Sequence, residues 1–201
     1  MEEQWHFLEN QFLVQTQKSF KKAVKLSKYH DSALKEGMDA GDPDFATLYN
    51  RYHPLHVTLL DKYNQWKADG GTQKSQTLNV NQLLKLMTGK INSWDAAVET
   101  VYGQTSVRYM QIFPNGHKPF QTGPQLSRID ALDTLSKAIG TDAALTAVKT
   151  AADTYYTQLQ DALTSQQGSI GLTKNSAIEV NNARIAAMQM QYADLGFLIN
   201  K

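Results

Sequence analysis

The chain has 201 residues, with 20 lysines and arginines against 19 aspartates and glutamates, so its formal net charge at pH 7 is +1. Because the charges nearly cancel, no global electrostatic field points to nucleic acid or to an anionic membrane as a partner. The absence of cysteine excludes disulfide bonds, thiolate metal ligands and a cysteine nucleophile. A chain of this length is expected to fold as one domain, covering residues 1–201.

Neither a secretory signal nor a membrane-spanning segment is predicted. The N-terminal sequence MEEQWHFLENQF has no basic region followed by an apolar stretch, and no window approaches 18 uncharged apolar residues. We therefore expect no membrane span and, by default, a cytoplasmic protein, with export by a route that needs no such signal left open.

Apolar residues recur with a helical period along the whole chain. This pattern predicts an all-α fold, an elongated up-and-down bundle of four to five long antiparallel helices plus one or two short helices. The expected helices cover about 3–37, 43–69, 79–102, 106–112, 124–139, 142–166 and 175–200, and a loop covers 113–123.

The first expected helix carries a broad, imperfect apolar stripe that begins with Trp5, Leu8 and Phe12. Because the stripe is imperfect, this helix is the one that we expect to expose an apolar side. A basic face on it consists of Lys18, Lys21, Lys22, Lys25 and Lys28. Such a face can bind phosphates or an acidic partner, but it has no interleaved arginine or stacking aromatic residue, so a solvated face is the favoured interpretation.

The second expected helix begins at Asp42 and Pro43, a good N-cap followed by a residue suited to the first helical position. Its apolar stripe keeps its phase across Pro54, which predicts one kinked helix. Gly70 and Gly71 are expected to end this helix. Asn79 and Gln82 then have the spacing of a capping box for the next one.

Two histidines flank the expected kink. His53 and His56 lie three residues apart on one helical face and could share a metal ion, or form a small-molecule site with Tyr49 or Tyr52 nearby. A metal site needs three or four ligands, and no second helix supplies a matching pair of ligands. Histidines that hydrogen-bond to a carbonyl or to a tyrosine hydroxyl are the favoured interpretation, and no cofactor is expected.

The segment FPNGHKPFQTGP, residues 113–124, interrupts the helical pattern. Phe113 and Phe120 are expected to pin it to the core, while His117, Lys118 and Phe120 are the candidate binding residues, because loops on rigid scaffolds often carry function. The next helix begins either with a Thr122 and Gln125 capping box or with Gly123 as cap before Pro124.

The last two expected helices are separated by the polar segment QQGSIGLTKNS. Thr141 is expected to cap the first of them after Gly140 has ended the preceding helix. The stripe assigned to the core side of the last helix is Ile178, Ile185, Met188, Tyr192, Leu195 and Ile199, with Asn181 at one seam position.

No standard hydrolase, phosphate-binding, dinucleotide-binding or zinc-protease motif is present, so we lean against an enzyme. The favoured hypothesis is a non-catalytic bundle that acts through protein–protein contact, as a structural subunit, an adaptor or a self-assembling module. A small-molecule or metal-binding bundle with a site near Pro54 is one alternative, and a secreted helical effector or toxin is another.

Overall fold

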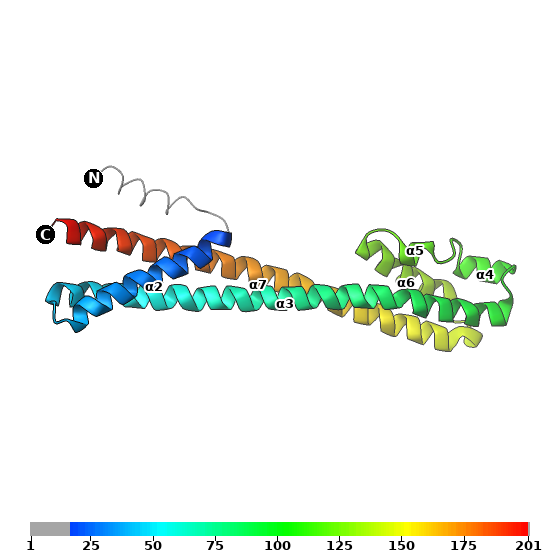
Figure 1. Ribbon diagram of the computed structural model, residues 1–201. Helices are drawn as coiled ribbons and strands as arrows, with labels where there is room; N and C mark the ends of the chain where they lie inside the picture. The colour runs from blue at the N-terminus through cyan, green and yellow to red at the C-terminus, as the bar shows by residue number, and fades with distance from the viewer. Residues whose placement is uncertain (1–16, 201) are drawn as a thin grey trace. The chain divides into compact units, whose positions relative to one another are not determined.

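The computed structural model describes residues 17–200, and side chains from residue 20 onward. The expected all-α bundle is confirmed: within this part of the chain there is no strand. The helices are α2 (Gln17–Asp39), α3 (Pro43–Tyr102), α4 (Val107–Ile112), α5 (Lys118–Gln121), α6 (Gln125–Ile139) and α7 (Thr146–Ile199), and a 3-10 turn, η1 (Ala143–Leu145), precedes α7 (Figure 1). Trp5, Leu8 and Phe12 lie outside the described residues.

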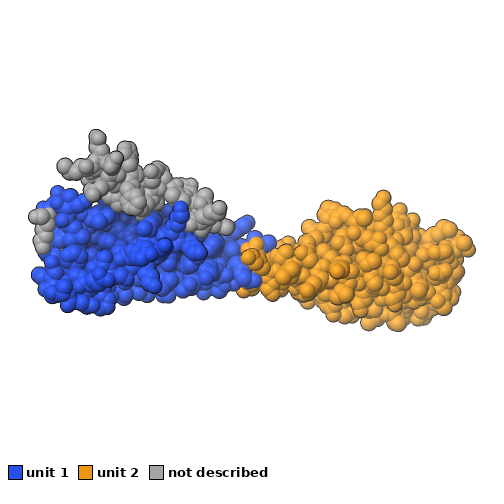
Figure 2. Space-filling view, in the orientation of Figure 1, with its two compact units in different colours: residues 1–71, 170–201 blue, residues 72–169 orange. Residues whose placement is uncertain are grey.

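The chain divides into two compact units (Figure 2). Unit 1 contains residues 1–71 and 170–201, and unit 2 contains residues 72–169. Both α3 and α7 contribute residues to each unit, because the unit boundaries fall within these two helices. The expectation of a single domain stays a prediction.

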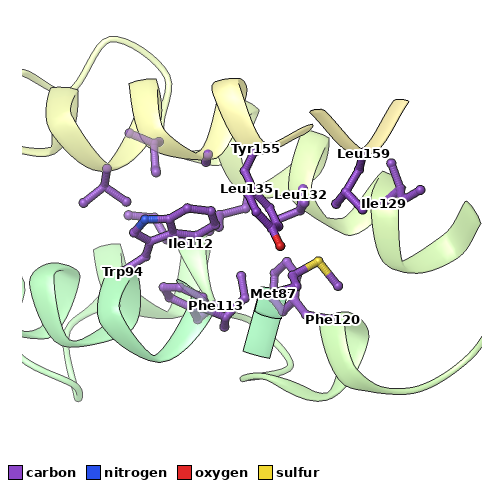
Figure 3. Close-up of a cluster of buried hydrophobic side chains, with 14 of the residues drawn as sticks. Met87, Trp94, Ile112, Phe113, Phe120, Ile129, Leu132, Leu135, Tyr155 and Leu159 are labelled. Atoms are coloured by element: carbon purple, nitrogen blue, oxygen red, sulfur yellow. The ribbon is translucent and has the colours of Figure 1, made fainter. Parts of the chain in front are cut away.

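The core of unit 2 is formed by the parts of α3 and α7 within that unit together with α4, α5 and α6 (Figure 3). Apolar residues at helical spacing are buried in these segments, from Val80 to Val98 on α3, from Ile129 to Ile139 on α6 and from Leu145 of η1 to Leu159 on α7. Trp94 of α3 packs edge-on against Tyr155 of α7, with ring centroids 6.3 Å apart. Phe113 and Phe120 are buried in this core, as predicted.

The expected loop over 113–123 is wrong at Lys118–Gln121, which form the short helix α5 with Pro119 in its first turn, where proline fits. We keep the name loop for residues 113–123.

The core of unit 1 joins α2, α3 and α7. Its buried residues are Phe20, Leu34, Leu48, Tyr52, Leu59, Val180 and Ala187. The rings of Phe20 and Trp66 meet edge-on with centroids 5.4 Å apart, which ties the start of α2 to α3.

Two of the predicted helix breaks are wrong. Helix α3 continues through Gly70, Gly71 and the expected capping box at Asn79 and Gln82, and α7 continues through the polar segment that was expected to separate two helices. Glycine, serine, threonine and asparagine have lower helix propensity than alanine, but packing along a continuous face outweighs a weak local preference. Pro54 lies inside α3, as the unbroken stripe predicted, and the expected kink there stays a prediction.

Two of the predicted caps are also wrong. Asp142, not Thr141, caps the turn before α7, because its Oδ1 accepts a hydrogen bond of 3.1 Å from the Ala144 N–H. The Thr122 hydroxyl donates to the Lys118 carbonyl, and Pro124 stands at the N-cap of α6, so neither expected start of that helix forms.

The expected helix start at Pro43 and the expected helix ends at 102 and 139 are confirmed. Asp42 Oδ1 accepts a hydrogen bond of 2.9 Å from the Asp44 N–H at the start of α3. Gly103 and Gly140 follow the last residues of α3 and α6 with φ of +74° and +63°, a left-handed backbone that glycine adopts without steric cost.

Replacing both Gly70 and Gly71 by alanine is expected to raise the free energy of unfolding by about 1–2 kcal/mol, since both lie within a helix. A Cβ added at either position meets no atom within 4 Å. Urea denaturation followed by circular dichroism measures the change. As a control, Gly103→Ala should destabilise the protein, because φ there is +74°. A loss of stability in the double variant would instead indicate a helix end at residues 70 and 71.

Candidate functional site

A buried polar cluster lies where the three helices of unit 1 meet. Ser27 Oγ of α2 is 2.6 Å from Tyr52 Oη and 2.9 Å from His56 Nδ1, both on α3. Gln191 of α7 donates to Tyr52 Oη at 2.9 Å. Burial raises the pKa of Tyr52 to about 12 and lowers the pKa of His56, so both groups are held neutral.

The cluster contains a serine next to a histidine, the pair that many hydrolases use as nucleophile and base. The Ser27 side chain is only 1% exposed and is already shared between two hydrogen-bond partners. A reacting carbonyl therefore has no access to its hydroxyl. The contacts are satisfied when Tyr52 donates to Ser27 and Ser27 donates to a neutral His56, which makes the cluster a link between helices.

His53, the other histidine predicted at this position, turns toward a different partner. Its Nδ1 is 2.9 Å from Asp31 Oδ1 of α2, and its ring stacks on Tyr49 with centroids 4.8 Å apart. The His53 and His56 ring centroids are 6.5 Å apart. Between residues 17 and 200, no group of three or more histidine, aspartate or glutamate side chains is placed to hold a metal ion. Metal binding by the two histidines stays a prediction.

A second polar contact in unit 1 was not predicted from the sequence. Asp194 of α7 is fully buried, and its carboxylate binds His30 Nε2 of α2 at 2.9 Å and the Arg51 guanidinium of α3. Three helices thus meet at one carboxylate. When the helical phase of α7 is continued through the polar segment, Asp194 falls on the buried side of the helix. A buried charge there indicates partners, because an unpaired charge is too costly to bury.

The predicted basic face of α2 is exposed at Lys21, Lys22, Lys25 and Lys28, as a solvated face requires. The Lys18 side chain lies outside the described residues. Lys25 Nζ sits 5.6 Å from the centroid of the exposed Tyr29 ring, a contact within one face of the helix. Binding of phosphates or of an acidic partner by this face stays a prediction.

The three candidate residues of the loop have different surroundings. His117 Nε2 is 2.9 Å from Asp95 Oδ2 of α3, and the Tyr109 hydroxyl donates to the other oxygen of the same carboxylate at 2.6 Å. The hydrogen bond to Asp95 raises the pKa of Tyr109. Lys118 is exposed, whereas Phe120 is buried. His117 and Phe120 therefore hold the loop on unit 2, and Lys118 faces solvent.

Four of the six residues predicted for the core side of the last helix, Ile178, Ile185, Tyr192 and Ile199, are exposed, whereas Met188 is buried as predicted and Leu195 is half-buried. Ile178, Ile185 and Ile199 are 60%, 40% and 62% exposed, and Tyr192 occupies the remaining position of the same seven-residue spacing. The buried side of α7 carries Val180 instead. We call Ile178, Ile185 and Ile199 the outer isoleucine line. The exposed apolar side expected on the first helix falls largely outside the described residues and stays a prediction.

Among residues 17–200, no helix combines the length and apolar character needed to cross a membrane. Comparisons of the chain with protein-family models, curated proteins and solved structures find no match. The class of protein that the fold defines is an all-α helical bundle.

Proposed function

We propose that this protein is a non-catalytic, self-assembling helical bundle, in which a second copy of the chain packs on the outer isoleucine line of α7. The proposal rests on one observation, the exposure of three isoleucines on one line of a single helix. Apolar residues at seven-residue spacing are typical of a surface that receives another helix.

The length of the line suits contact between two helices. From Ile178 to Ile199 the line extends about 32 Å at 1.5 Å per residue. Two antiparallel copies related by a two-fold axis would bring the Ile178 end of one copy to the Ile199 end of the other. A two-fold contact uses the same surface on both copies, so one self-complementary line is sufficient.

The charge around the line also favours a second copy. Lys174 and Glu179, near the Ile178 end, are exposed and charged, whereas the exposed positions Asn175, Asn182 and Gln189 beside the line are polar and uncharged. Like charges that face each other across an interface cost several kcal/mol, and these three positions bring none. Interface cores are depleted of charged residues in the same way.

Sedimentation velocity of the full chain tests the proposal. A contact of one helix per copy is smaller than a standard interface, so we expect a monomer–dimer equilibrium between about 1 µM and 1 mM. Ile185→Glu should weaken the dimer at least about tenfold, because it places a charge at the centre of the contact.

The matched control is Leu78→Glu, which changes an exposed leucine of α3 in unit 2. It should leave the dimer unchanged, and circular dichroism should show that both variants keep their helices. A chain that stays monomeric over the whole concentration range contradicts the proposal. So does a dimer that Ile185→Glu and the control affect equally.

A further inference from the structure

A hollow of about 350 Å³ lies in unit 2 between the loop after α4 and helix α6. One wall is apolar and comes from the loop, with Phe113, Pro114 and Phe120 among its residues. The other wall is a face of α6 that includes Ala131 and Leu135. Pockets that bind small molecules have volumes of about 300–1,000 Å³, so this one suits a small ligand.

Hydrogen bonds to the rest of unit 2 hold the loop wall in place. The Asp95 carboxylate binds both Tyr109 and His117, which flank the start of the loop. Arg128 of α6 donates to the Phe120 carbonyl at 2.7 Å and to the Leu84 carbonyl of α3 at 2.8 Å. The hollow is therefore formed before any ligand arrives, which lowers the entropic cost of binding.

The charge of the lining selects one kind of ligand. Asp130 is the one charged residue among the residues that line the hollow, and it is exposed at the rim of α6. No lysine or arginine among the described side chains is seen to pair with the Asp130 carboxylate. The polar side chains of Ser127 and Thr134 lie on the same face, one turn before and one turn after Asp130.

We propose that this hollow binds a small organic cation, an aromatic ring joined by a short alkyl chain to an ammonium group. The ring packs against Phe113, Phe120 and Leu135, where its apolar surface is removed from water. The ammonium group lies at the rim beside the Asp130 carboxylate, with Ser127 and Thr134 as neighbouring acceptors. This site is independent of the outer isoleucine line, which belongs to unit 1.

The probes for the test are tryptamine and indole-3-propionate, which carry the same ring and opposite charges. In nuclear magnetic resonance titrations of the full chain, tryptamine should shift the amide signals of residues 113–120 and 127–135. Indole-3-propionate should bind about tenfold more weakly, since attraction to one exposed carboxylate is replaced by repulsion.

Two variants and one control complete the test. Asp130→Asn should remove the preference for tryptamine, and Ala131→Phe should abolish binding of both probes by filling the hollow. Asp133→Asn is the matched control, because its carboxylate lies on the same helix but already pairs with Lys137. It should leave both affinities unchanged. Binding of neither probe at millimolar concentration, equal binding of both, or a preference that survives Asp130→Asn would each overturn the proposal.

Discussion

Replacing Trp94 by alanine is expected to lower the free energy of unfolding by about 3–5 kcal/mol, the cost of removing a large aromatic side chain from a core. Trp94 is buried on α3 and meets Tyr155 of α7 edge-on (Figure 3). The truncation leaves a cavity that rigid neighbours cannot fill, since the Tyr155 hydroxyl is fixed by a hydrogen bond to the Leu83 carbonyl. Urea denaturation followed by circular dichroism measures the loss.

The control for this prediction is Leu86→Ala on the same helix. Leu86 is exposed, so its truncation should change the free energy of unfolding by less than about 0.5 kcal/mol. A loss below about 1 kcal/mol for Trp94→Ala would show that the indole does not hold the core of unit 2 together.

The helical phase of α3 continues past residues 70 and 71, where the helix was expected to end, and this continuation is visible in the sequence. After Trp66, Gly70, Gln73 and Thr77 are partly buried, and the buried Val80 follows. These residues continue the alternating steps of three and four without a gap. Glycine and polar residues at these buried-side positions obscure the continuity of the helix, because the apolar residues that normally mark the helical phase are missing there and glycine has a low helix propensity.

The same error displaced the assignment of the last helix. The buried side of α7 continues from Leu159 through Ser169 and Ser176 to Val180, in one phase. A new phase that starts after the predicted break places the more apolar line, which includes Ile178, on the core side. Polar seam residues are tolerated here where a partner exists, as at Gln166, whose amide donates to the Thr77 hydroxyl at 3.1 Å.

The loop is only partly predictable from the sequence. Its proline and glycine residues predict an irregular segment, and Phe113 and Phe120 predict that the segment packs on the core. The pairing of His117 with Asp95 joins residues 22 positions apart, and the hollow depends on residues from both the loop and α6. Such contacts follow from the packing of elements, so no local pattern in a single sequence indicates them.

Removal of the buried carboxylate in Asp194→Ala is expected to lower the free energy of unfolding by about 3 kcal/mol. The change leaves the His30 imidazole without the acceptor 2.9 Å away and deprives the Arg51 guanidinium of its anion. We expect a loss at the lower end of the range for breaking a buried ion pair. The reason is that the Arg51 side chain is partly exposed, so water can replace its partner. Hydrogen exchange should show the loss in the helices of unit 1.

Two comparisons separate the effect of the charge from that of the side chain. Asp194→Asn keeps an acceptor oxygen of the same shape, so it should cost about half as much as Asp194→Ala. Asp39→Ala breaks an exposed pair with Lys35 on α2 and should cost less than about 0.5 kcal/mol. If Asp194→Ala were no more destabilising than Asp39→Ala, the carboxylate would contribute nothing to holding α2 and α3 on α7. The helices of unit 1 would then depend on their apolar contacts alone, among them those of Phe20, Leu34 and Val180.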